Sequence, residues 1–245
     1  LGGDAYEEAV EAADPISGVP SVRRRLGAFR ERLSTVESFV PELRPGFAVP
    51  DDIRHRPEGV YDLAVEIRDV VATAQEAIEA ADDLSFDAEQ FESWVTHSDR
   101  RYDAFEEDVE LVRESVADLE AAADAVADAD DPAAQWADAT MRGQVLSLLV
   151  SDLRAERRDL RAIAELTGDP VRDGLGAALG PTADRLEAVE SALAGRAVPA
   201  WRDRFGTDVE ALAGALAPLD PPVEWGTVDR ILREHRPDAI GEVSR

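Results

Sequence analysis

The sequence contains no lysine, no cysteine and no asparagine, so all 26 of its basic side chains are arginines. Without lysine, the chain cannot have a Walker A lysine, a kinase phosphate-binding lysine or a Schiff base with pyridoxal phosphate. Without cysteine, it has no disulfide, no thiolate metal ligand and no thiol nucleophile. These absences exclude several large enzyme classes.

Long apolar runs are also missing. The stretch VLSLLV at 145–150 is far shorter than the roughly 20 apolar residues that a membrane-spanning helix needs. Residues 1–14 lack a basic region followed by an apolar core, so we expect no signal peptide. The sequence therefore predicts a cytoplasmic protein with no membrane partner.

Acidic residues are abundant: 53 of them against 26 basic ones give a formal net charge of -27. This composition, with arginine in place of lysine, resembles the proteomes of extreme halophiles, especially haloarchaea. Dense surface carboxylates repel one another in a compact fold, and molar salt screens that repulsion by shortening the Debye length to about 3 Å. We therefore expect a halophilic protein whose fold loosens in dilute buffer.

Apolar residues recur at alternating intervals of three and four over most of the chain. The clearest row lies in residues 102–126, and others lie in 21–43, 58–83, 136–167 and 181–196. Such spacing is typical of coiled coils and helical bundles, and no window shows the sustained alternation of a strand. The pattern predicts an all-α fold, an elongated antiparallel helical bundle with coiled-coil hairpins. Its heptads resemble those of spectrin-like and SMC-like coiled coils, which are shared too widely to imply a function.

Capping signals suggest where the helices begin. Asp87 with Gln90 forms a capping-box pattern, and Asp131 stands directly before Pro132. These signals predict a long hairpin of helices 87–129 and 132–167, made antiparallel by its short connection. The same Asp-Pro pattern at 169–170 predicts another helix start.

The domain organisation follows from these helices. We expect residues 1–197 to form one heptad-patterned bundle. Residues 198–245 contain five prolines among short helical segments, together with Trp201, Phe205 and Trp225. We expect those aromatics to dock the tail on the bundle as a small C-terminal helical cap. More generally, we interpret the four tryptophans as core or docking residues rather than as ligand-stacking ones.

Four arginines of the segment RAERRDLR share one helix face: Arg154, Arg157, Arg158 and Arg161. A hairpin turn near residue 131 would place Arg154 opposite Asp108, within the acidic segment 102–110. The favoured interpretation is a ladder of ion pairs between the two helices that fixes their register. The alternative is a strip that binds phosphate or another acid.

A second basic cluster lies at the start of the 21–43 helix and includes Arg23, Arg24 and Arg30. Nucleic acid is an unlikely partner for it, because the rest of the chain is strongly acidic and molar salt weakens such binding. The glycine-rich segment 174–180 lacks the preceding strand of a nucleotide-binding loop, so it predicts close helix packing or a kink.

The three histidines, His55, His97 and His235, provide no metal site. A di-metal carboxylate bundle needs Glu three residues before a histidine on two helices, and none of the three has it. His97 interrupts an apolar row, which favours a satisfied polar position at a bend over a metal-binding or pH-sensing role. We assign no catalytic, cofactor-binding or metal-ligating residue, and we expect no cofactor and no small-molecule ligand.

Three functions remain as hypotheses. The first is a non-enzymatic protein-interaction or scaffold module that binds a protein partner or a second copy through helical surfaces. The second is an enzyme or ligand-binding bundle with a carboxylate-based site, and the third is a nucleic-acid-associated protein. An uncovered apolar row would favour the first, a pocket with convergent acids the second, and a positive patch the third.

Overall fold

The computed structural model describes residues 2–46 and 59–237, which form eight α-helices and no strand. The expectation of an all-α helical bundle is confirmed. Contacts divide the chain into two compact units, Leu1–Arg100 and Arg101–Arg245. The expected boundary at 197/198 does not coincide with this division. Residues 199–216, which belong to the expected cap, form a helix that packs directly on the helix 132–167, within the second unit.

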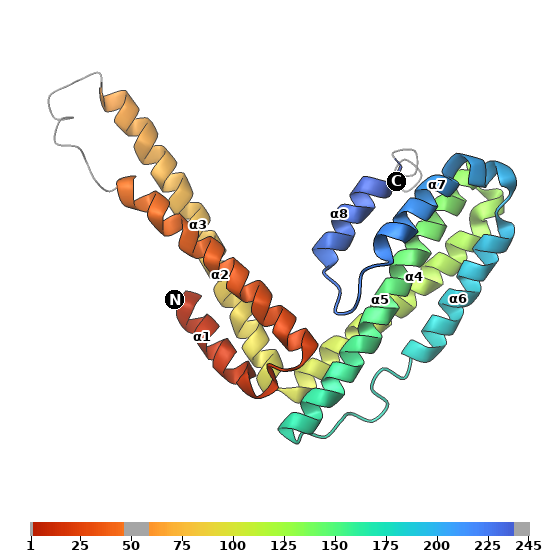
Figure 1. Cartoon of the computed structure of the whole chain (residues 1–245), viewed down its shortest axis with the longest axis horizontal. Coiled ribbons are helices and arrows are strands. Elements are labelled where there is room, and N and C mark those ends of the chain that lie inside the picture. Colours follow the sequence, from red (N-terminus) through yellow and green to blue (C-terminus); the bar gives the residue numbers. More distant parts are fainter. Residues whose placement is uncertain (1, 47–58, 238–245) are drawn as a thin grey trace. The chain divides into compact units, whose positions relative to one another are not determined.

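The first unit contains three helices: α1 (Gly2–Ala13), α2 (Pro20–Gly46) and α3 (Gly59–Thr96). The heptad analysis did not predict α1. A 3₁₀ turn, Asp14–Ile16, follows this helix. Both α1 and α2 pack on α3, and α2 runs antiparallel to it (Figure 1). The core combines Ala9 and Ala13 with the first half of α2 and the second half of α3.

Aromatic and cationic side chains join α2 to α3. Phe29 lies 5.3 Å from Phe91 between ring centroids, and Phe91 stacks on Trp94. The guanidinium of Arg25 lies 4.4 Å from the centre of the Trp94 ring, a cation–π contact. Asp87 forms an ion pair with Arg32, in the interior of α3. The capping box predicted at Asp87 and Gln90 is therefore wrong, since tertiary pairing uses the Asp87 carboxylate.

The predicted helix 87–129 is two helices, α3 and α4 (Ser98–Ala125), with His97 between them. The His97 N–H still donates to the Ser93 carbonyl at 3.1 Å, while its Nδ1 lies 3.0 Å from that oxygen and 2.9 Å from Thr96 Oγ1. Local side-chain bonds of this kind compete with the helical ladder. His97 thus lies at the break between two helices, with local hydrogen-bond partners for its ring, as expected for a satisfied polar position.

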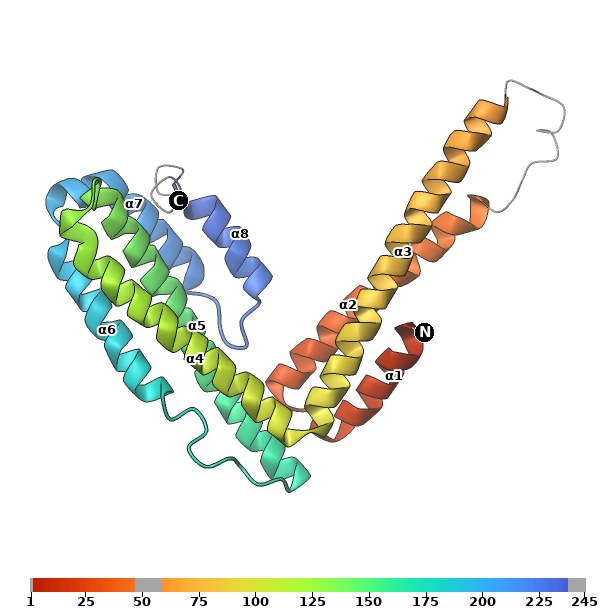
Figure 2. The same ribbon diagram turned by 180° about the vertical axis from the view of Figure 1, so that it is seen from behind.

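The second unit comprises α4 and four further helices: α5 (Pro132–Thr167), α6 (Leu179–Arg196), α7 (Pro199–Leu216) and α8 (Trp225–His235). The long helix α5 packs against both α6 and α7, and α8 packs on α7 (Figures 1 and 2). Helix α4 runs antiparallel to α5 and buries eight residues.

The turn between α4 and α5 agrees with its prediction. A 3₁₀ turn, Val126–Asp128, ends α4, and Asp131 caps α5 by accepting the Ala134 N–H at 3.1 Å. Pro132 stands at the first helical position, where its missing N–H leaves no bond unmade. The register agrees as well: Leu119 reaches Gly143, and Phe105 and Arg157 meet beside Gly176.

The helix start predicted at Asp169–Pro170 is wrong. Gly168 ends α5 in the left-handed region, at φ 77°, and residues 169–178 form turns and irregular structure. This segment is held on the first turns of α4. Arg101, only 1% exposed, donates to Asp169 Oδ2 at 2.9 Å, and Tyr102 Oη donates to the Pro170 carbonyl at 3.1 Å. The Asp169 carboxylate therefore pairs with the buried Arg101 and does not cap a helix.

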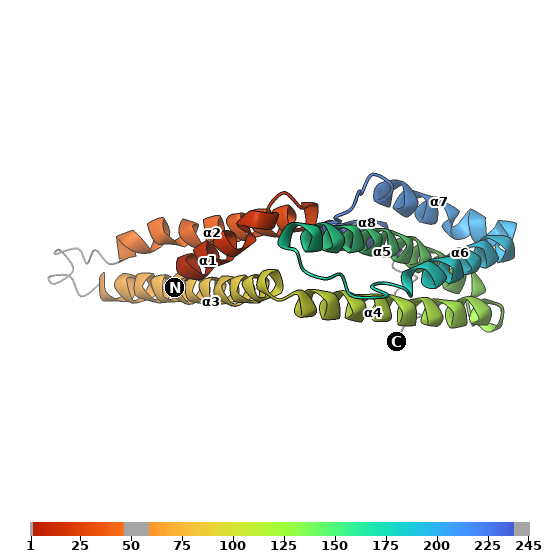
Figure 3. The ribbon, with the colours of Figure 1, turned by 90° about the horizontal axis from the view of Figure 1, so that it is seen from below.

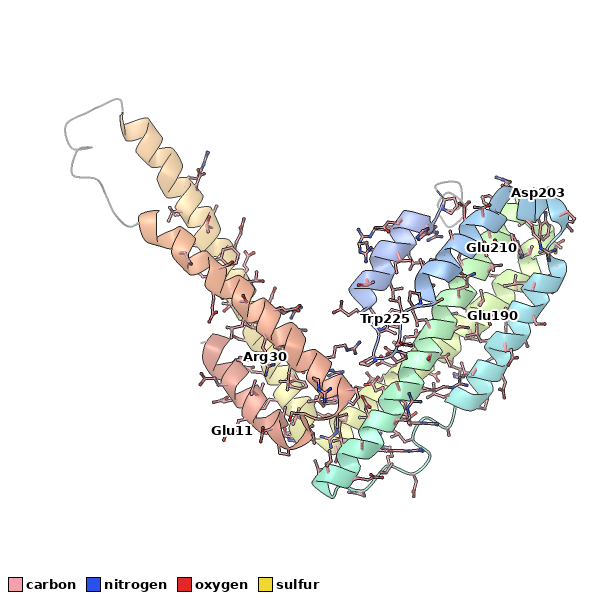
Figure 4. All side chains as sticks on the ribbon, viewed as in Figure 1. Glu11, Arg30, Glu190, Asp203, Glu210 and Trp225 are labelled. Carbon is pink, nitrogen blue, oxygen red and sulfur yellow. The ribbon has the colours of Figure 1, made fainter. Side chains whose placement is uncertain are left out.

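The tryptophans pack as expected. Trp136 Nε1 donates to the Leu193 carbonyl at 3.1 Å, and Trp201 of α7 lies against Trp136, with centroids 6.4 Å apart. Trp225, at the start of α8, donates to Asp152 Oδ2 at 3.1 Å (Figure 4). Aromatic docking of the C-terminal helices is what the sequence predicts, although they dock within the second unit. Residues 238–245 of the expected cap lie outside the described residues.

Candidate functional site

Burial changes sharply along the hairpin of α2 and α3. On α2, Val22, Leu26 and Phe29 are buried, whereas the next apolar residues, Leu33 and Val36, are only half-buried. On α3 the order is reversed, because this helix runs the other way. Its half-buried residues come first and its buried ones follow: Val70, Ala74, Ala77 and Ala81, then Leu84, Ala88 and Phe91. One continuous heptad row is therefore fully covered at one end of the hairpin only.

The length of α1 explains this change. At about 1.5 Å per residue, twelve residues span roughly 18 Å and the 38 residues of α3 roughly 57 Å. Figures 1 and 2 both show α1 beside the second half of α3 only, and Figure 3 shows it against the hairpin from below. The other half of the hairpin is a pair of helices with no third helix from the described residues.

A second apolar row, with exposed large side chains between half-buried alanines, lies along this uncovered half of α3. Val71, Ala74, Ile78 and Ala81 recur at intervals of three, four and three, so they share one helix face. Val71 is 49% exposed and Ile78 is 60% exposed. We call these four residues the outer row. The heptad analysis missed Val71 and Ile78, because it followed the adjoining row through Val70 and Ala77, which shares Ala74 and Ala81 with the outer row.

The second unit has a different candidate feature, a cavity of about 460 Å³ among α5, α6 and α7. Its apolar wall includes Trp136, Leu193 and Val209, and its polar wall includes Glu190 and Glu210. Figure 4 shows Glu190 on α6 and Glu210 on α7. The volume lies within the range of small-molecule pockets.

Hydrogen-bond acceptors of Gln144, Glu190 and Glu210 line this cavity, together with the guanidinium of Arg202. Gln144 Nε2 donates to the Val209 carbonyl at 3.2 Å, but the buried Gln144 Oε1 accepts no hydrogen bond. Glu190 Oε1 accepts from Ser147 Oγ at 2.8 Å, and Arg202 already donates to the Ala194 carbonyl. The side with Gln144 Oε1 and the two carboxylates suits a ligand group that carries N–H donors.

The ladder of ion pairs predicted for the arginine stripe is not formed within the described part of the chain. Arg154, Arg158 and Arg161 are exposed and bond no residue that the structure describes. Arg157 instead lies beside Phe105 and donates to the Gly176 carbonyl at 3.3 Å. The predicted register is correct, but these side chains lie outside the seam between the two helices.

The acids of α4 are paired with other arginines, from α6 and the segment before it. Arg172 bonds Asp103 at 2.7 Å and Arg185 bonds Glu120 at 2.5 Å. The hydrogen bond from Arg185 holds the pKa of the Glu120 carboxyl below its usual range. At the end of α4, Arg196 forms an ion pair with Asp124 at 2.8 Å. Two of these ion pairs, Arg185 with Glu120 and Arg196 with Asp124, join α6 to α4.

Three arginines of the basic cluster at the start of α2 make contacts within the first unit. Arg23 donates to the Gly18 carbonyl at 3.1 Å, Arg25 covers Trp94, and Arg30 donates to Tyr6 Oη at 3.3 Å. Figure 4 marks Arg30 on α2 and Glu11 on α1. These contacts show how arginines of α2 support α1 and α3, and they leave a nucleic-acid role without a specific observation in its favour.

The described residues contain no cluster of three or more histidine and acidic side chains able to hold a metal ion. His55 lies outside the described residues. Among the helices that the structure describes, none is long and apolar enough to cross a membrane.

In the glycine-rich segment 174–180, residues 174–178 form turns, and Leu179 and Gly180 begin α6. Gly174 and Gly176 have positive φ values of 74° and 65°. The Gly176 N–H donates to Glu106 Oε1 at 2.9 Å, which ties the segment to α4. The sequence predicts close helix packing or a kink here. Gly176 does lie close to Phe105 and Arg157, but it stands in an irregular connection between α5 and α6 and not in a helix.

No protein-family model matches the chain, and neither a curated protein nor a solved structure is significantly similar to it. Arguments about function therefore rest on the residues themselves.

Proposed function

We propose that this chain is a non-enzymatic interaction module that binds another protein chain through the outer row of α3, in a cytoplasm of high salt. The observation that carries the proposal is the exposure of Val71 and Ile78 on the half of the α2–α3 hairpin that no third helix of the described residues covers. Apolar side chains aligned on one face are stabilised when a partner helix removes them from water.

The charge of the chain supports the high-salt part of the proposal. A net charge of -27 opposes association between acidic chains in dilute buffer, whereas molar salt screens charge and leaves apolar contacts intact. An interface built on Val71 and Ile78 is suited to that condition.

The test is affinity capture of tagged protein expressed in a host with molar intracellular KCl, in lysate held at about 2–3 M KCl. A second, differently tagged copy is co-expressed, so that self-association and other partners are both detected. We expect the double variant Val71→Ser/Ile78→Ser to lose at least about 90% of the captured protein, since each buried side chain contributes about 1.5–3 kcal/mol.

The matched control is Leu111→Ser/Leu166→Ser, which removes two equally exposed apolar side chains, 60% and 59% exposed, from the second unit. It should capture as much as the wild type. If the outer-row variant captures the same proteins in the same amounts, or if the wild type captures nothing, the proposal is wrong.

The cavity favours a second candidate function, the binding of a small organic cation. Its support is the buried Gln144 Oε1, which accepts no bond, beside the carboxylates of Glu190 and Glu210. 1,4-Diaminobutane is the probe, and a rise in melting temperature that disappears in Glu190→Gln/Glu210→Gln would support this function. An unchanged melting temperature at millimolar diamine would refute it.

A further inference from the structure

The outer row of α3 has the pattern of one half of an antiparallel helix pair. Its residues occupy the two core positions of a heptad: Val71 and Ile78 take one, and Ala74 and Ala81 take the other. In an antiparallel pair, each core position faces the other kind of core position on the partner helix. A second copy of α3 would therefore set each large side chain of the row against an alanine.

This arrangement is complementary to itself. With the two helices crossing near residues 75–76, Val71 faces Ala81 of the second copy and Ile78 faces Ala74. The same contacts recur on the other side of the crossing, as two-fold symmetry requires. Large against small in every layer allows close packing without cavities.

The charges beside the row complement each other in the same arrangement. Arg68, Gln75 and Asp82 are exposed and lie seven residues apart, so they form one edge of the row. In an antiparallel pair this edge meets its own copy: Arg68 lies near Asp82 of the second chain, and the two Gln75 side chains meet at the crossing. Neither Arg68 nor Asp82 bonds a residue that the structure describes. The acidic Glu76, Glu79 and Asp83 lie farther from the row.

At one end of the hairpin, α1 packs beside α2 and α3 as a third helix. At the other end, where the second copy would lie, no helix of the described residues takes that place. Asp87, Phe91 and Trp94 show which side of α3 faces α2. At helical spacing the outer row lies on the opposite flank of the seam, along the uncovered half of the hairpin. Two hairpins joined there make a four-helix bundle with α3 of each chain at its centre.

We infer that this chain forms an antiparallel homodimer through the outer row of α3, with its two-fold axis close to Gln75. The inference rests on the proposed function and names its partner as a second copy of the chain. Because α3 carries many carboxylates, the dimer should tighten as salt rises, unlike one held by ion pairs.

Because the chain has no cysteine, single cysteines report on the arrangement directly. Gln75→Cys is treated with a short bis-maleimide at about 2 M KCl. Its matched control is Glu76→Cys, an exposed neighbour at the same level on the opposite face of the helix. We expect Gln75→Cys to form a covalent dimer at least about ten times faster than Glu76→Cys. The direction of the helices is tested by mixing Arg68→Cys with Asp82→Cys, which should cross-link to each other and not to themselves.

Light scattering gives the second measurement. The wild type should have twice the chain mass of 26.5 kDa at 2 M KCl, and Val71→Ser/Ile78→Ser should weaken the dimer at least about 100-fold while keeping its helical circular dichroism. A mass of 26.5 kDa at every concentration, or equal cross-linking of Gln75→Cys and Glu76→Cys, overturns the homodimer. If another protein is still captured through Val71 and Ile78, the proposed function survives that result. If Arg68→Cys and Asp82→Cys each cross-link only to themselves, the antiparallel arrangement is wrong.

Discussion

The two units use the same heptad spacing but complete their cores to different degrees. In the second unit, α5 has α6 and α7 on its sides, and the exposed large apolar residues are scattered over separate elements: Leu111, Leu166, Val171 and Val198. In the first unit they are concentrated on α3, where Val71, Ile78 and Phe86 are exposed. A heptad row thus specifies an apolar face, but a third helix must be present to cover it.

Ion pairs between helices also differ between the two units. In the second unit, arginines join elements far apart in sequence, as Arg185 joins α6 to α4 and Arg204 joins α7 to Asp131. In the first unit, Arg32 of α2 forms an ion pair with Asp87 of α3, near the covered half of the hairpin. In the uncovered half, the described residues Leu33 and Val36 of α2 and Val70 and Ala77 of α3 are half-buried apolar side chains.

The largest expected effect compares one phenylalanine from each unit. Phe105 is 1% exposed and Phe86 is 60% exposed. Phe105→Ala should reduce the free energy of unfolding of the second unit by about 3–5 kcal/mol, because it leaves a cavity. Phe86→Ala should change stability by less than about 0.5 kcal/mol. Urea unfolding at constant molar KCl, followed by tryptophan fluorescence, measures both. Equal losses would contradict the contrast between the two units.

A smaller effect is expected at the connection between α5 and α6. A Cβ at Gly176 would lie 2.9 Å from Arg157 Cδ and 3.0 Å from Phe105 Cε1, and the residue has a positive φ of 65°. Gly176→Ala should therefore destabilise the second unit by about 1–3 kcal/mol.

Gly214 is the matched control, since it lies inside α7 with no atom within 4 Å of an added Cβ. Gly214→Ala should have the opposite sign and stabilise by up to about 1 kcal/mol. If both variants change the melting temperature in the same direction, the close packing at Gly176 does not limit stability.

The smallest effect concerns pH at the α4–α5 turn. The N–H of Ala134, followed by the guanidinium of Arg204, holds the pKa of the Asp131 carboxyl below its usual range. A carboxyl with a lowered pKa stabilises the fold above its unfolded pKa, and this stabilisation is lost as pH falls through the folded value. Asp131→Asn keeps a cap that does not titrate.

We therefore expect wild type to exceed Asp131→Asn in stability by about 0.5–1 kcal/mol at pH 7, with the difference shrinking below about pH 4. Urea titrations at a series of pH values measure this difference. Asp130→Asn, at the exposed neighbouring residue, should show no such trend. A difference that stays constant down to pH 3 would show that charge at Asp131 does not contribute.

Local signals in the sequence predicted much of the second unit. Asp131 and Pro132 placed the start of α5, and the short turn set the register that brings Leu119 to Gly143. The same kind of signal failed at Asp87 and Asp169, because each carboxylate bonds an arginine remote in sequence. A capping pattern cannot show whether its carboxylate has a tertiary partner.

The candidate sites were less predictable than the fold. The arginine stripe was visible in the sequence, but rotation of α5 places Arg154 and Arg158 outside the seam, and α6 supplies the partners of the α4 acids. The cavity brings together α5, α6 and α7, which no local pattern connects. The outer row was present in the sequence as Val71, Ala74, Ile78 and Ala81, but it could not be distinguished from an ordinary buried row.

The sequence by itself determined the helical class, the approximate helices, the antiparallel turn at residue 131 and the strongly acidic surface, because periodicity, capping and composition act over a few residues. Only the tertiary structure decided which apolar face is covered, which carboxylate meets which arginine, and where the chain divides into two units. Those outcomes depend on the lengths and rotations of helices that lie far apart in the chain. The short α1 is the clearest case, since its twelve residues cover one end of α3 and leave Val71 and Ile78 exposed.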